Sequence, residues 1–95
     1  MHFPRWCESP EGQTDHERSV KRLRFLLNRA AILTVPECTY TAFAEHCGIN
    51  KSNLHRWMKV GALPAPMATT IERSVGSEVV RAVDLMFPLE ITSNS

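Results

Sequence analysis

The sequence predicts a small all-α domain made of five short helices. Apolar residues recur at three- and four-residue spacing along several segments, which is the period of a helix that buries one face. Glycines and prolines separate these segments, and residues that commonly cap helices precede them. No convincing strand pattern of alternating apolar and polar residues is present. A chain of 95 residues is long enough for one such domain.

The first helix is expected to begin after Thr14. Thr14 and Glu17 have the spacing of a capping box, in which each side chain can reach the backbone N–H group of the other. Apolar residues then recur at helical spacing as far as position 33. Pro36 should end the helix, because proline disfavours helix in the residue before it. Basic residues on the other face are expected to be solvated: Arg18, Arg22 and Arg29.

The remaining helices are expected over residues 40–46, 51–59, 67–75 and 78–86. Residues suited to N-capping precede three of them: Thr39, Asn50 and Ser77. Glycines, which readily adopt positive φ, should terminate three helices: Gly48, Gly61 and Gly76. A short extended piece is expected at residues 89–91.

Three stretches of the chain are distinguished by composition. Residues 1–13 hold two prolines, a glycine and little periodicity, so a flexible N-terminal arm is expected there. Residues 14–88 should form the domain, and residues 89–95 a C-terminal tail. The start lacks the basic and apolar regions of a signal peptide. No apolar run approaches the roughly 18 residues that a membrane span needs, so no membrane partner is expected.

The cysteines Cys7, Cys38 and Cys47 are scattered and odd in number, which is more typical of a reducing cytosol than of a disulfide scaffold. No CxxC or HxxxH pair offers zinc ligands at their usual spacing. The sequence also has no phosphate-cradling glycine loop and no nucleophile elbow. We therefore expect a soluble cytoplasmic protein that is not an enzyme and takes no metal, cofactor or small-molecule ligand.

The charges are unevenly distributed, although the formal net charge is only +1. Residues 16–60 carry eight lysine or arginine residues against three acidic ones, whereas residues 1–15 and 61–95 each have a net charge of −2. No acidic residue lies between Glu45 and Glu72, a gap of 26 residues. A basic block with acidic flanks suggests a polyanionic partner.

The stretch from Ala42 to Gly61 has the pattern of a helix-turn-helix. Two short helices that cross steeply need a tight turn and a small residue at the crossing. Ala44 supplies the small residue, and Gly48 supplies the turn. Apolar residues of both helices and the turn should close the core beneath them: Phe43, Cys47, Ile49, Leu54, Trp57 and Met58.

The other face of the second of these helices is polar and basic. A recognition helix presents residues near its N-terminus to base edges in the major groove of DNA. Arginine and lysine donate to guanine, and asparagine pairs with adenine. Five residues are expected to read bases: Lys51, Ser52, Asn53, His55 and Arg56. Three more are better placed for phosphates, where contacts position a protein without specifying sequence: Thr39, Tyr40 and Lys59.

The segment YTAFAEHCGINKSNLHRW, residues 40–57, resembles the helix-turn-helix of Cro-like phage repressors and YdaS-like prophage regulators. The similarity continues through four later motifs: GALPA at 61–65, IERSVG at 71–76, VR at 80–81 and DL at 84–85. The resemblance covers roughly residues 39–88. The proline-spaced second half is the more specific part of it.

This resemblance implies a Cro/lambda-repressor-like fold and a small repressor or antirepressor. Such a protein binds operator DNA, usually as a dimer, in the bacterial or phage-infected cell, where it is associated with the nucleoid. The chain departs from the group in two places. It carries 38 residues before Thr39, the N-cap of the second helix, and it has Met86-Phe87 where the group commonly has an arginine.

Apolar residues near the C-terminus exceed what a core of this size should absorb. Four of them are expected to form a dimer interface, because a two-fold operator is matched by a two-fold protein: Met86, Phe87, Leu89 and Ile91. The first helix, with Phe25, is the next candidate surface.

Two alternatives stay open for the function. The run from Arg56 to Pro64 is also similar to the R-W … G-x-x-P pattern of excisionase-like architectural proteins, which bend DNA. The same fold could also serve as a protein-interaction module, such as an antirepressor or a phage inhibitor of a host protein.

Overall fold

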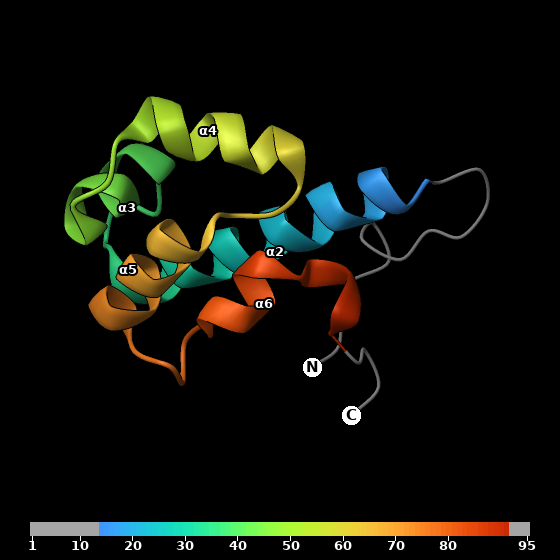
Figure 1. Ribbon diagram of the computed structural model, residues 1–95. Helices are drawn as coiled ribbons and strands as arrows, with labels where there is room; N and C mark the ends of the chain where they lie inside the picture. Colours follow the sequence, from blue (N-terminus) through green and yellow to red (C-terminus); the bar gives the residue numbers. More distant parts are fainter. Residues whose placement is uncertain (1–13, 92–95) are drawn as a thin grey trace.

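The computed structural model describes residues 14–91, which form five α-helices and one short 3₁₀-helix (Figure 1). In chain order these are α2 (Asp15–Thr34), α3 (Tyr40–Cys47), α4 (Lys51–Val60), α5 (Ala65–Val75), α6 (Ala82–Met86) and η1 (Pro88–Glu90). The all-α prediction is confirmed for this part of the chain. The arm expected at residues 1–13, with Cys7, lies outside the described residues, as does the end of the expected tail. Within residues 14–91, no helix combines the length and the apolar character needed to cross a membrane.

Helix α2 begins and ends where the sequence predicts. The Thr14 hydroxyl accepts a hydrogen bond from the Glu17 N–H group at 3.1 Å and lies 3.2 Å from the Glu17 carboxylate, to which it donates. The helix ends at Thr34, and Val35 is extended, as a residue before proline prefers. Helix α2 contacts α3, α4 and η1, so it is the central helix on which these elements pack.

A three-residue turn joins α3 to α4. Gly48, at its start, adopts the left-handed conformation (φ 71°, ψ 31°), which a side chain would disfavour. Thr39 and Asn50 cap the two helices, and each side chain accepts the N–H group three residues later, at 3.1 and 3.0 Å. Gly61 ends α4 with φ 95°. These caps confirm the predicted boundaries of α3 and α4 to within one residue.

Helices α5 and α6 begin at other residues than predicted. Helix α5 starts at Ala65, because Pro66 fits in the first turn, where its missing N–H group has no intrahelical partner to lose. Helix α6 starts only at Ala82, and Ser77 does not cap it. The Glu72 carboxylate of α5 instead accepts the Ala82 N–H group at 3.2 Å.

The segment after α6 forms the 3₁₀-helix η1 rather than an extended piece, and it packs against α2. The Arg22 guanidinium donates to the carbonyl oxygens of Pro88 and Ile91, each at 3.1 Å. Arg22 is only 3% exposed, so the prediction that it lies on a solvated face is wrong. Arg29, predicted on the same face, donates to the Val79 carbonyl and is half-buried. Two arginines of α2 thus hold the C-terminal third of the domain.

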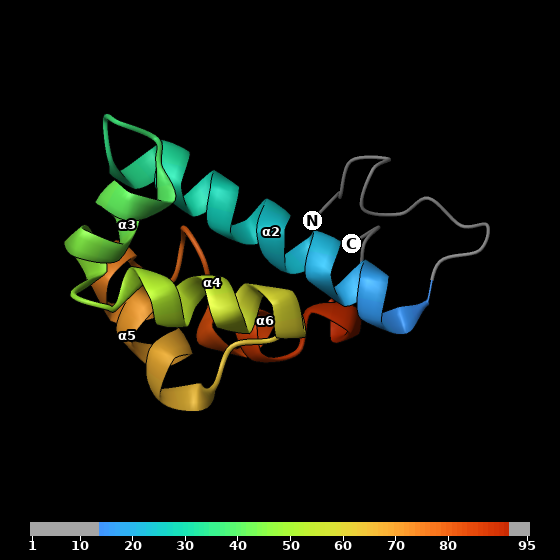
Figure 2. The same ribbon diagram turned by 90° about the horizontal axis from the view of Figure 1, so that it is seen from above.

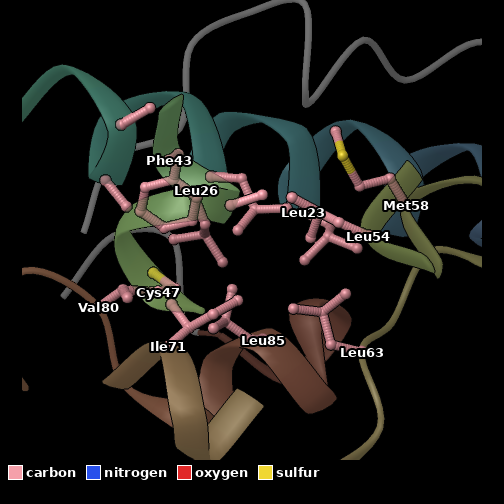
Figure 3. Close-up of a cluster of buried hydrophobic side chains, with 14 of the residues drawn as sticks. Leu23, Leu26, Phe43, Cys47, Leu54, Met58, Leu63, Ile71, Val80 and Leu85 are labelled. Carbon is pink, nitrogen blue, oxygen red and sulfur yellow. The ribbon is translucent and has the colours of Figure 1, made fainter. Parts of the chain in front are cut away.

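The core lies between α2 and the other helices (Figures 1 and 2). Figure 3 shows buried side chains from α2, α3, α4, α5 and α6 meeting in one cluster. The central members are at most 1% exposed: Leu26, Phe43, Leu54, Ile71 and Leu85. Full burial of a side chain of this size contributes about 1.5–3 kcal/mol, so these contacts fix how the helices pack.

The predicted inner face of α3 and α4 is largely confirmed. Five of its members are buried: Phe43, Ala44, Cys47, Leu54 and Met58. Ile49 and Trp57 are half-buried and pack at the edge of the core. Leu33, the last residue of the apolar pattern in α2, is 58% exposed. It lies at the edge of the buried stripe of α2, to which Leu27 and Ala31 belong.

Candidate nucleic-acid interface

Helix α4 forms the top of the molecule in Figure 1, with α2 beside it and α6 on the far side of the core. Its buried face, with Leu54 and Met58, fixes the rotation of the helix on the core. Five polar or basic side chains on the rest of the helix are exposed: Lys51, Ser52, Asn53, Arg56 and Lys59. The residues that the sequence placed on one outward face, apart from His55, therefore reach solvent together.

The N-terminal turn of α4 concentrates positive potential. Lys51 lies there, next to backbone N–H groups that have no intrahelical acceptor. A cation at this end opposes the helix dipole by about 0.3–1 kcal/mol, and the first turn holds no acidic residue. This arrangement slightly destabilises the helix, but it attracts an anionic partner to its N-terminus.

Arg56 lies against its neighbour Trp57. The guanidinium carbon is 5.9 Å from the centre of the half-buried indole ring. Cation–π contacts at exposed sites contribute about 0.5–1 kcal/mol. The contact therefore restricts the conformations of Arg56 while its side chain stays exposed.

His55 and Tyr40 face each other across the junction of α4 and α3. Their rings are perpendicular, with centroids 5.6 Å apart, and both residues are half-buried. The Tyr40 hydroxyl donates to the Asn28 side-chain oxygen. Burial raises the pKa of the Tyr40 phenol, and the Arg24 guanidinium partly opposes this shift. His55 therefore points toward α2 and α3, apart from the exposed face that carries Ser52.

Thr39 is exposed at the N-terminus of α3. Its oxygen accepts the Ala42 N–H group at 3.1 Å, so its role as a cap is established within the domain. The hydroxyl proton is the part of this side chain that could bond a phosphate oxygen. Of the three residues predicted for phosphate contact, Thr39 and Lys59 are exposed and Tyr40 is half-buried.

A hollow of about 270 Å³ lies between α2 and α4. It is lined by Val20, Arg24, Tyr40, His55, Met58 and Lys59. Sequence reasoning did not single out Arg24 for the interface. Arg24 directly follows Leu23, which belongs to the buried stripe of α2. A residue beside that stripe lies near the helices that pack on it, and this position could have pointed to Arg24.

The four residues predicted for a dimer interface fall into two groups. Phe87 and Leu89 are 47% and 37% exposed. Met86 and Ile91 are half-buried and pack against the core. The next candidate surface named from the sequence, on the first helix with Phe25, carries a groove of about 380 Å³ on α2, lined mainly by Phe25, Ile32 and Leu33, with Asn28 and Arg29.

The cysteines of the described residues differ in their surroundings. Cys47 is buried, as predicted from its place at the helix crossing, and Cys38 is exposed. Burial raises the pKa of the Cys47 thiol, which a hydrogen bond with Ser74 partly offsets. Residues 14–91 contain no group of three or more His, Cys, Asp or Glu side chains that could hold a metal ion.

No protein-family model matches the chain, and neither the curated proteins nor the solved structures gave a match. The resemblance to Cro-like and YdaS-like regulators therefore stays a prediction from the motifs. The function is inferred from the residues and geometry of the chain itself.

Proposed function

We propose that the protein binds double-stranded DNA in a sequence-specific manner and acts as a transcriptional repressor or regulator of the Cro type. In this proposal α3, the turn at Gly48 and α4 form a helix-turn-helix, with α4 as the recognition helix. The observation that carries the proposal is the exposed face of α4. It holds three cations and two short polar side chains, and the helix contains no acidic residue.

The chemistry of this face fits the major groove. Arg56 and Lys51 can donate to guanine, and Asn53 can pair with adenine. Ser52 can donate or accept, so it suits either kind of base edge. Lys59, at the last turn of α4, is better placed for a phosphate of the groove wall. Asn50 holds the first turn in place, so these side chains start from a fixed backbone.

Selection of bound sequences from a random duplex library tests the proposal directly. We expect enrichment of a short motif, and binding that weakens steeply with salt because cations on the protein displace counterions from the phosphates. Salt-sensitive binding without enrichment would favour a non-specific architectural role. Failure to retain any duplex at low salt would contradict DNA binding altogether.

We further propose that the protein binds its operator as a homodimer through Phe87 and Leu89. Both side chains are exposed. Leu89 belongs to η1, which Arg22 fixes to α2, and Phe87 immediately precedes it. Sedimentation should show a dimer at high micromolar concentration, and Phe87→Glu should yield a monomer. Ile32→Glu, at another exposed apolar residue, is the matched control. A monomeric wild type would exclude this dimer, and a dimer broken only by Ile32→Glu would place the interface on α2.

One observation favours a protein partner as the second candidate function. The groove of Phe25, Ile32 and Leu33 is almost wholly apolar, which is typical of surfaces that bind other proteins. If the wild-type protein does not bind random duplex at any salt concentration, the result would support this candidate over DNA binding.

A further inference from the structure

We propose that the hollow between α2 and α4 is a binding site for a backbone phosphate of DNA, held by Arg24 of α2 and by His55 and Lys59 of α4. This inference rests on the proposed function. It adds a second helix to the interface, and it assigns His55 to the DNA backbone rather than to a base.

The lining of the hollow is suited to an anion. Arg24 and Lys59 are exposed and cationic at neutral pH, and the His55 ring adds an N–H donor. Among residues 14–91, no carboxylate lines it. The apolar members of the lining are Val20 and Met58.

The location of the hollow fits the DNA backbone better than a base. In Figure 2, seen from above, α2 and α4 run side by side, and the contacts between the two helices confirm that they are neighbours. The hollow therefore borders the exposed face of α4 on its α2 side. When a recognition helix lies in the major groove, the groove walls are phosphates, and the element beside the helix meets those walls.

Internal contacts hold both walls of the hollow. The Ser19 hydroxyl donates to the Gly61 carbonyl, which ties the C-terminal end of α4 to α2. At the other end, the Tyr40 hydroxyl bonds Asn28 of α2, and the Tyr40 ring packs edge-on against His55. A site whose walls are already fixed loses little freedom when a phosphate binds.

Arg24 is the residue that best tests the site. Its guanidinium offers paired N–H donors that match two phosphate oxygens. It is also close enough to Tyr40 to act on the pKa of the phenol, as expected for a side chain directed into the hollow. Its side chain is exposed, so its removal should leave the core intact.

The experiment measures binding of a fluorescein-labelled random-sequence duplex by anisotropy over a range of salt concentrations. Arg24→Ala should weaken binding about fivefold to tenfold at 0.1 M salt and reduce the log–log salt slope by about 1, as loss of one phosphate contact requires. Arg24→Lys should keep most of the slope, because it keeps the charge. Circular dichroism should show unchanged helix content in both variants.

Arg81→Ala is the matched control. It removes the same charge just before α6, and α6 lies on the opposite side of the core from α4 (Figure 1). If Arg24→Ala binds like Arg81→Ala while the wild type binds duplex, the phosphate site is wrong and the proposed DNA binding stands. If the wild type binds no duplex, both ideas fail.

His55→Ala separates the two roles of that residue. A phosphate contact predicts the same fold-loss of affinity on random duplex and on a duplex selected by the wild type. A loss confined to the selected duplex would show that His55 reads a base, which would remove it from the proposed site.

Discussion

At the scale of single residues, Arg56 and Arg24 show how one kind of side chain serves two purposes. Arg56 projects from the exposed face of α4 and lies against Trp57. Arg24 lines the hollow where α2 meets α4. A guanidinium that reaches a base edge contributes discrimination between sequences, whereas one that bonds a phosphate contributes affinity to every sequence. The two arginines should therefore differ in the effect of their removal.

Arg56→Ala should cost about 1–3 kcal/mol in binding a selected duplex and should relax the preference at one base pair. The reason is that an alanine at this position leaves the base edge without its donor pair. Binding to duplexes with each base substituted in turn measures the effect, and Arg81→Ala serves as the control. An equal loss on selected and random duplex would show that Arg56 contacts a phosphate instead.

Cys47 should make the stability of the fold depend on pH in the alkaline range. Its pKa is raised in the folded state above the ordinary value of 9.0, chiefly by burial. As the pH rises past that ordinary value, the unfolded thiol loses its proton first. The free energy of unfolding is therefore unaffected by this group at lower pH and falls as the pH rises, by at most about 1.4 kcal/mol per pH unit.

Urea unfolding at neutral pH and at a pH above 9.0 measures this dependence. Cys47→Ala is the comparison: it should be less stable at neutral pH, because it removes buried volume, and should lose less stability as the pH rises. Equal losses in the wild type and the variant would show that other groups cause the alkaline dependence.

At the scale of helices, the boundaries that depend on nearby residues are the ones that the sequence predicts. Thr14, Thr39 and Asn50 each accept an N–H group three residues later, and such local caps are visible as short patterns. The start of α6 depends on Glu72, ten residues before the N–H group that it caps, and was predicted wrongly. Burial of Arg22 depends on carbonyl groups 66 and 69 residues away, which no periodicity in α2 reveals.

The two glycines that end α3 and α4 allow the cost of a positive φ to be separated from the cost of crowding by neighbouring side chains. Both have positive φ, which costs an L-residue about 1–2 kcal/mol. A Cβ atom on Gly48 would meet nothing within 4 Å, whereas one on Gly61 would lie 3.3 Å from atoms of Ser19 and Val20. We expect Gly61→Ala to lower the free energy of unfolding by more than Gly48→Ala does.

Urea unfolding of both alanine variants gives the comparison. The excess loss at Gly61 reports how tightly α4 is held to α2 at the end of the phosphate-site hollow, because the Ser19 hydroxyl also bonds the Gly61 carbonyl. Equal losses would show that Ser19 and Val20 move aside without cost, and hence that this junction is loose.

At the scale of the whole molecule, the candidate interface is partly a local and partly a tertiary feature. The exposed residues of α4 follow from the helical period and a buried stripe, so the sequence predicts them. Arg24 lies next to these residues only because α2 packs beside α4. His55 does not share their exposed face, because Tyr40 of α3 lies against its ring. The packing of three helices therefore decides which cations share one surface.

The number of cations on that surface predicts how binding responds to salt. In each protomer two of these cations are assigned to phosphates, Arg24 and Lys59, whereas Lys51 and Arg56 are assigned to base edges. At about 0.9 per neutralised phosphate, the log–log slope should be roughly −1.8 for one protomer, and a dimer should approach about −3.6. The slope thus reports the assembly on DNA as well as the size of the contact.

Anisotropy titrations of a selected duplex over a range of salt concentrations measure this slope. The wild type should give the steeper value, and Phe87→Glu, which should separate the protomers, should give about half of it. A wild-type slope of about −1.8 would mean that one protomer binds alone and that the Phe87 surface has no part in recognition. A slope near zero would contradict the cationic face as the source of affinity, because exposed cations cannot approach phosphates without releasing counterions.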